Sequence, residues 1–136
     1  MFKLVKIEGS GTNQAEPIRM KTSEYATYRA HCAYMCGDGT IDSLDSESVP
    51  TYIALENAEP GEKESILCYR IQSNMIFEVP VNGSFTALNA DTKYVADISE
   101  DGSGVGITTS TVNGKITLCD PNGAKRSKDT VYVRIV

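Results

Sequence analysis

A chain of 136 residues, 40% of them hydrophobic, is long enough for one domain with a sizeable core. Its net charge of −5 argues against general nucleic-acid binding, which depends on a surplus of Lys and Arg. No apolar run approaches the roughly 18 residues of a membrane span, and charges interrupt the first eight residues, where a signal peptide has its apolar segment. We therefore expect a single domain over residues 1–136 that is not exported and has no membrane or nucleic-acid partner.

The N-terminal third of the chain is polar and broken by turn residues. Residues 2–8 predict an opening strand, which a Gly- and Ser-containing loop ends. Residues 22–34 suit a strand and a short helical turn equally well, and we expect a short irregular segment there. A turn at residues 37–40 and an acidic, Ser-rich loop at 41–50 follow. We therefore expect residues 1–50 to form an irregular N-terminal arm with loops.

The few apolar residues of this arm need a surface to cover, because the segment is too polar to build a core of its own. That need makes them candidates for contact with a partner. The candidate partner-binding residues are Phe2, Leu4, Ile7, Ile18 and Met20.

The rest of the chain, residues 51–136, is expected to form the β core. The segment 65–72 is apolar on both of its alternating faces, which predicts a central strand. Pro80 cannot donate a backbone hydrogen bond, so the alternating strand around it is predicted to lie at an edge or to end there. Further strands are predicted at residues 51–55, 84–88, 92–98, 107–112, 115–119 and 130–136.

Turn signals separate these strands. Asn113-Gly114 predicts a tight hairpin that pairs residues 107–112 with 115–119, and Asn82-Gly83 predicts a second hairpin. No internal repeat is evident. Short strands at intervals of about 8 to 12 residues with turns between them predict an all-β fold, either a small barrel or a sandwich with hairpins.

The chain has four cysteines and one histidine. His31, Cys32 and Cys36 could ligate zinc, but the fourth ligand would have to come from Cys68 or Cys119, and no paired C-x-x-C is present. Reduced thiols are the expectation for a chain that is not exported. We therefore predict structural thiols, no metal and no cofactor.

Three fragments resemble motifs of the trimeric dUTPases, which are also small β-barrels: Gly39-Thr-Ile-Asp-Ser43, Arg70-Ile-Gln72 and Gly102-Ser-Gly-Val-Gly106. That resemblance would make Asp42 the residue that activates water. The chain lacks the family's metal-binding and phosphate-binding motifs before residue 39, and its Gly-rich fragment lacks the aromatic residue that stacks on the base. Asp42 is more simply a turn residue. We expect no catalysis and no catalytic residue.

From residue 50 to residue 136 the chain resembles the small β-domain of tailed-phage head decoration proteins and their prophage relatives. The segments that carry the resemblance are Thr51-Tyr-Ile-Ala-Leu55, Ser65-Ile-Leu-Cys-Tyr-Arg-Ile71, Asp91-Thr-Lys-Tyr-Val95, residues 107–120 and the closing Asp129-Thr-Val-Tyr-Val-Arg-Ile-Val136. The resemblance implies a virion structural protein without an active site. Such a protein would bind the major capsid protein on the outside of the head shell, commonly as a homotrimer, after assembly in the host cytoplasm. It would reinforce the shell through its N-terminal arm.

A second interpretation is a small intracellular β binding or adaptor module of a phage particle, in the tail or the connector. The charge distribution bears on both interpretations. Residues 38–64 contain eight acids and one Lys, whereas residues 111–136 contain two acids and five basic residues. This asymmetry is typical either of a solvated acidic region or of neighbouring copies that meet acid to base.

Overall fold

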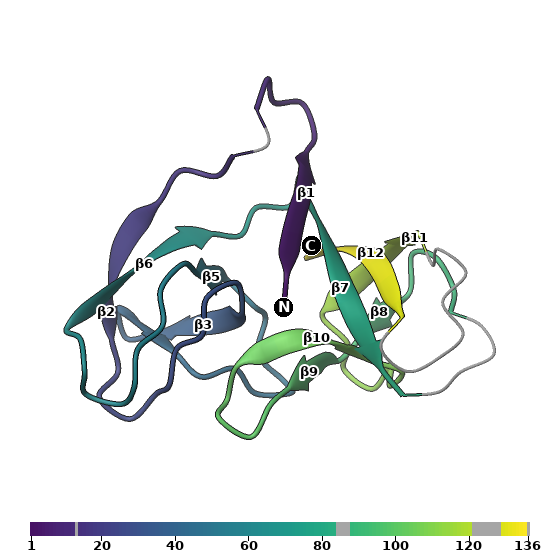
Figure 1. Cartoon of the computed structure of the whole chain (residues 1–136). Coiled ribbons are helices and arrows are strands. Elements are labelled where there is room, and N and C mark those ends of the chain that lie inside the picture. The colour runs from purple at the N-terminus through teal and green to yellow at the C-terminus, as the bar shows by residue number, and fades with distance from the viewer. Residues whose placement is uncertain (13, 84–87, 121–128, 136) are drawn as a thin grey trace.

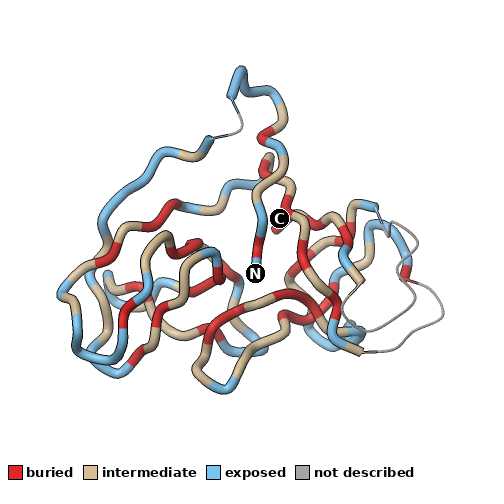
Figure 2. The backbone as a smooth tube through the Cα atoms, viewed as in Figure 1, coloured by how far each residue is buried: buried red, intermediate tan, exposed pale blue. Residues whose placement is uncertain are grey.

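The computed structural model describes residues 1–12, 14–83, 88–120 and 129–135, and all regular structure within them is β-strand (Figure 1). The predicted all-β class is confirmed. Within the same residues, no helix exists that could cross a membrane. The buried hydrophobic side chains form two clusters, one in each of two rings of strands, and one cluster also includes side chains from β1 and from the outer face of the other ring. Figure 2 shows where the buried residues lie along the backbone.

The first ring, which we call barrel A, is built from β2 to β6. Its pairs β2–β6, β6–β5, β5–β3 and β3–β4 are antiparallel, and the parallel pair β4–β2 closes it. Tyr28 and Tyr34 pack inside with ring centroids 5.1 Å apart. The strands are β2 (Ile18–Thr22), β3 (Ala33–Gly37), β4 (Thr40–Asp42), β5 (Tyr52–Ala54) and β6 (Ser65–Arg70).

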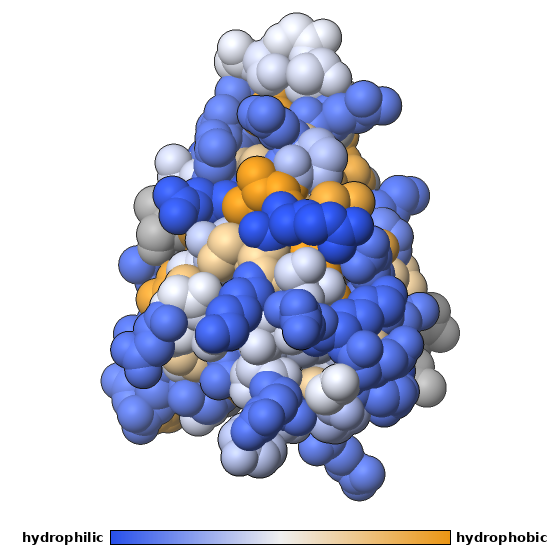
Figure 3. Space-filling model, turned by 90° about the vertical axis from the view of Figure 1, so that its left-hand side faces the viewer, coloured by the Kyte–Doolittle hydropathy of each residue, from blue (hydrophilic) through white to orange (hydrophobic). Residues whose placement is uncertain are grey.

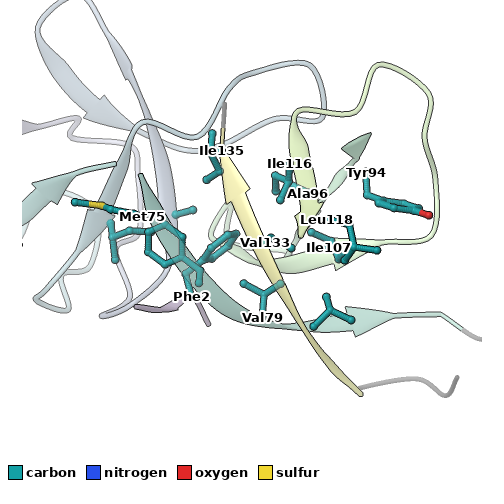
Figure 4. Close-up of a cluster of buried hydrophobic side chains, with 14 of the residues drawn as sticks. Phe2, Met75, Val79, Tyr94, Ala96, Ile107, Ile116, Leu118, Val133 and Ile135 are labelled. Carbon is teal, nitrogen blue, oxygen red and sulfur yellow. The ribbon is translucent and has the colours of Figure 1, made fainter. Parts of the chain in front are cut away.

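The second ring, barrel B, is built from β7 to β12. Val95 alone separates β8 from β9, so these two act as one bent strand. The antiparallel pairs β7–β12, β12–β11, β11–β8 and β9–β10 and the parallel pair β10–β7 close the ring. Figure 4 shows its buried side chains, which come from every part of the ring. The strands are β7 (Met75–Asn82), β8 (Lys93–Tyr94), β9 (Ala96–Ile98), β10 (Gly104–Thr108), β11 (Ile116–Asp120) and β12 (Thr130–Ile135).

The two barrels have the same topology. In each, the first strand pairs antiparallel with the last and parallel with the third, the last pairs with the fourth, and the fourth pairs with the second. Their closing strands both lead to Arg-Ile, at Arg70-Ile71 and Arg134-Ile135. The sequence shows no evident repeat, yet the fold contains one. The two barrels share the order and pairing of their strands, although almost all of their side chains differ.

The segment expected to be an irregular arm contains four strands. β2, β3 and β4 belong to barrel A, and β1 (Lys3–Ile7) pairs antiparallel with β7. Phe2 is fully buried and meets Phe77 edge to face at 5.8 Å between ring centroids. The expected irregularity is thus wrong, because many apolar side chains of residues 1–50, among them Phe2, Ile7 and Ile41, are buried within the chain itself.

The barrels are joined through a shared row of side chains. Alternation along β3, β5 and β6 turns one set of residues into barrel A and the other set outward. The outward residues Ala33, Ile53 and Tyr69 lie side by side in register and belong to the core of barrel B. The predicted central position of β6 is confirmed, since it lies between β2 and β5 with both faces in contact.

The start of β10 completes this junction. Gly104 pairs with Ala33, and a Cβ on Gly104 would lie 2.7 Å from the Leu44 side chain, so only glycine permits the approach. The neighbouring Ser103 is almost fully buried, and its hydroxyl bonds the Tyr34 hydroxyl at 2.7 Å. Val105 packs against the interior of barrel A. One short backbone segment therefore touches both cores.

The turn predicted at residues 37–40 forms, and it closes a hairpin that was not predicted. Asp38 and Gly39 both have positive φ, 51° and 80°, and join β3 to β4 as a primed two-residue turn. The predicted Asn113-Gly114 hairpin is wrong, because β10 pairs with β9 and β7 while β11 pairs with β12 and β8. The strand predicted at 84–88, to which the Asn82-Gly83 hairpin would lead, lies largely outside the described residues.

The edge position predicted from Pro80 is also wrong, because β7 has partners on both sides. Pairing with β1 ends at Glu78 and pairing with β10 begins at Val81. Pro80 lies between these two points, so its missing N–H interrupts no ladder on that side.

We predict that substitution of Gly114 destabilises the protein for a reason other than turn geometry. A Cβ there would lie 2.3 Å from the Lys93 backbone oxygen, so Gly114→Val should lower the free energy of unfolding by about 2–3 kcal/mol. Urea unfolding measures the change. Gly11→Ala, whose Cβ meets nothing within 4 Å, is the matched control. Equal stability of the two variants would contradict the close approach of residue 114 to β8.

Stability should fall at alkaline pH. Burial raises the pKa of Tyr34 from its ordinary 10.0 to about 12, so the unfolded chain loses this proton before the folded chain does. The stabilising contribution is complete below pH 10 and is lost as pH rises through about 12. Burial also raises the pKa of Cys68 to about 11, so Tyr34→Phe should reduce the decline without abolishing it.

Urea unfolding between about pH 9 and 11.5 checks this, with Tyr25→Phe, at a position 84% exposed, as the control. The same pH slope in Tyr34→Phe and in the control would exclude Tyr34 as a source of the decline.

Candidate functional site

A groove of about 800 Å³ lies between β1, the linker of residues 14–17 and the outward face of β6. We call it the interbarrel groove. Its apolar lining comes from Met1, Leu4, Ala15, Pro17, Tyr69 and Pro80. Its polar lining comes from Lys3, Gln14, His31, Glu78 and Thr130. The volume and the mixture of apolar walls with a few polar groups are typical of a binding site.

Tyr69 is the distinctive side chain of the groove. Its position on β6 turns it out of barrel A, and it is 6% exposed. Its hydroxyl has no hydrogen-bond partner among the described residues, and burial raises its pKa. A fully buried hydroxyl usually finds a partner within the protein, but the Tyr69 hydroxyl is not among the buried polar atoms that lack one, so it is accessible to solvent.

The other buried tyrosines follow that rule. The Tyr28 hydroxyl donates to the Ile41 carbonyl, and the Tyr94 hydroxyl accepts the Asn89 N–H at 3.2 Å. The Tyr52 hydroxyl accepts from the Arg70 guanidinium at 3.2 Å. Tyr69 thus differs from them in having a hydroxyl that remains available within the groove.

The outer edge of β1 forms one side of the groove. The Phe2 N–H points away from β7 and donates to the His31 carbonyl at 2.7 Å. Because backbone groups of alternate residues point the same way along an antiparallel strand, the N–H and C=O of Leu4 also point away from β7. Neither has a backbone partner in the described parts of the chain. An open strand edge therefore borders the apolar walls.

The rim of the groove carries charge. Lys3 is exposed and forms no ion pair with any residue that the structure describes, whereas Glu78 accepts a hydrogen bond from Thr130 at 3.4 Å. The Met1 amine donates to the Val105 carbonyl at 2.7 Å, and burial lowers its pKa. Lys3 therefore lies directly opposite the Glu78 carboxylate in the β1–β7 pair without forming an ion pair with it.

The structure separates the five residues predicted to bind a partner. Phe2 and Ile7 are buried in the core, and Met20 packs against the interior of barrel A, so none of the three presents an open surface. Leu4 is half-buried and lines the interbarrel groove. Ile18 is 38% exposed and borders a smaller hollow of about 260 Å³ beside Arg70 and Met75.

Sequence reasoning missed Tyr69 as a site residue, because a tyrosine in an apolar strand predicts a core position.

The face on the barrel A side is mostly hydrophilic, with a small hydrophobic patch (Figure 3). The groove, rather than a broad apolar face, is thus the candidate site.

The residues considered for metal binding do not form a site. Cys32 is buried and Cys36 is exposed on the following strand. In residues 1–12, 14–83, 88–120 and 129–135, no group of three His, Cys, Asp or Glu side chains is placed to hold a metal ion.

Two of the dUTPase-like fragments do meet in space. A Cβ on Gly102 would lie 2.6 Å from the Ser43 Oγ, at the barrel junction. The turn predicted at Asp42 is wrong, because Asp42 ends strand β4, and its carboxylate accepts the N–H of Ser43 at 2.7 Å. The contact between these fragments is accounted for by packing of the barrels.

Arg134 from the basic C-terminal segment is engaged within the chain. It forms an ion pair with Glu8 at 2.6 Å, and its Nε donates to the Cys119 Sγ at 3.2 Å.

Comparison with protein families, curated proteins and solved structures found no match to this chain.

The state of the Tyr69 hydroxyl predicts an unusual mutational result. Tyr69→Phe should change the free energy of unfolding by less than about 0.5 kcal/mol, because no protein hydrogen bond is lost. Tyr34→Phe should lower it by about 1–3 kcal/mol, because Ser103 and the Arg29 N–H lose their partner. Urea unfolding at neutral pH compares them. A loss from Tyr69→Phe as large as that from Tyr34→Phe would mean that the hydroxyl is already bonded.

Proposed function

We propose that this chain is a non-catalytic virion structural protein of a tailed phage, which binds the outer surface of the capsid shell through the interbarrel groove. The observation that carries the proposal is the groove itself: apolar walls, an open strand edge and the accessible hydroxyl of Tyr69 meet at one place. The capsid as partner comes from the resemblance of residues 50–136 to head decoration proteins.

The mechanical character of the fold supports a structural role. The two barrels share buried side chains, and one segment of β10 contacts both interiors. A load applied to one barrel would therefore pass to the other through packed side chains. A reinforcing protein needs this rigidity, whereas an enzyme would also need reactive groups brought together.

Charge supports contact between neighbouring copies. Acidic loops of barrel A expose Asp45, Glu47 and Glu62, and barrel B exposes Lys93 on β8. Copies arranged with these regions in contact would be oriented by charge, which sets register more than affinity. We propose a homo-oligomer, with the trimer favoured by the resemblance. Repeated weak contacts over a closed shell would stabilise it through avidity.

Shell binding should depend on the groove. In co-sedimentation with undecorated heads, the full chain should pellet with shells, and Leu4→Glu should weaken binding at least about tenfold, because a buried carboxylate disrupts an apolar contact. Lys3→Glu, an exposed change that leaves the core intact, should also weaken it. Tyr25→Glu, at an 84% exposed position away from the groove lining, is the control.

Circular dichroism and the unfolding midpoint establish that each variant is folded, and light scattering of the free protein measures its oligomeric state. No binding of the unaltered chain to heads would remove the capsid from the proposal. Binding to isolated tails instead would favour the adaptor interpretation. Full binding by both groove variants would exclude the groove as the contact.

A further inference from the structure

We infer that the interbarrel groove binds an extended peptide segment, which pairs as an added strand with the outer edge of β1. One apolar side chain of the segment packs against Tyr69, and a carboxylate of the segment lies at Lys3. This inference deepens the proposed function by naming the chemistry of the partner segment, and it rests on that function only for the source of the segment.

The backbone of β1 indicates a strand as the occupant. β1 pairs with β7 along one edge, and the other edge presents the Leu4 N–H and C=O toward the groove. An extended peptide satisfies both groups at once through a pair of main-chain hydrogen bonds, which is the usual chemistry of strand addition. A compact small molecule would satisfy them less completely.

The opposite wall limits pairing to β1. Residues 14–17 form no strand, and Pro17 has no N–H to donate. The guest strand would thus hydrogen-bond on one side and make apolar contacts on the other, with Ala15 and Pro17. The connection between β1 and β2 rises beyond the end of β1 and then descends toward β2 (Figure 2). Gln14 and Pro17 are exposed and Ala15 is half-buried, so this wall lies at the surface where a segment can enter.

Tyr69 lies at the floor of the groove and favours an apolar side chain of the guest peptide that points inward. Tyr69 presents its ring as apolar surface and its hydroxyl as a donor and acceptor. Alternate residues of a strand point to opposite faces, so one apolar residue of the guest can cover the ring. The hydroxyl can then bond a main-chain carbonyl of the same segment.

The charge at the rim of the groove favours one kind of guest residue beside Lys3. Lys3 lies opposite Glu78 in the β1–β7 pair, but the two form no ion pair, and Glu78 accepts a hydrogen bond from Thr130 at 3.4 Å. A carboxylate on the guest would neutralise the Lys3 ammonium. The preferred segment is therefore extended, rich in β-branched residues and acidic at one position.

Selection from a random heptapeptide library on the immobilised full chain tests the inference. We expect enrichment of sequences that alternate apolar and polar residues and include Asp or Glu. A synthetic peptide of the enriched sequence is then measured by fluorescence polarisation, and its contact is mapped by amide shifts, which should be largest for residues 3–6.

Three variants separate the contacts. Leu4→Pro removes the outward N–H without removing a bond to β7, and should weaken peptide binding at least about tenfold. Tyr69→Phe removes only the hydroxyl and should weaken it about fivefold. Lys3→Glu should shift the selected sequences from acidic to basic. Tyr25→Ser, outside the groove lining, should leave binding unchanged.

The outcomes distinguish this inference from the capsid proposal. No enrichment above a blank surface, or binding insensitive to both Leu4→Pro and Tyr69→Phe, overturns the peptide site even if shells bind the chain. Peptide binding that both variants weaken supports the site even if shells do not bind, and in that case only the source of the segment is wrong.

Discussion

The structure depends on the close passage of the backbone at residues 102–105 between two cores. Gly104 approaches Ala33 and Leu44 too closely for any side chain, and Ser103 bonds Tyr34 in the interior. This contact is what converts two small barrels into one rigid unit, because a separate five-stranded barrel of about 55 residues would bury too little surface to be very stable. A larger residue at position 104 would act on both cores at once.

The same construction creates the interbarrel groove. The row of Ala33, Ile53 and Tyr69 is covered by barrel B along most of its length, and β1 adds to that cover. Cover ends at Tyr69, where β1 has one unpaired edge and the linker of residues 14–17 passes without forming a strand. The groove is thus the place where the packing of two repeated units remains incomplete, which is where a partner has the most to add.

The lining of the groove suits recognition of a peptide chain. It offers backbone donors and acceptors and apolar walls, together with the polar side chains of Lys3, Gln14, His31, Tyr69, Glu78 and Thr130. Two residues that suggested chemistry in the sequence have contacts within the chain: the Asp42 carboxylate accepts the Ser43 N–H, and the Cys119 Sγ accepts a hydrogen bond from Arg134.

The sequence by itself determined the strand class, the alternation of β7 and β12 and the turn at residues 37–40, because those depend on neighbours along the chain. It did not determine which strands pair: Asn113-Gly114 has the same local signal as Asp38-Gly39, yet its flanking strands find other partners. The sequence pattern around Tyr69 is the same whether its hydroxyl is hydrogen-bonded or free. Only the tertiary structure decided these points, because strand pairing and the burial of a side chain depend on residues that are far apart in the sequence.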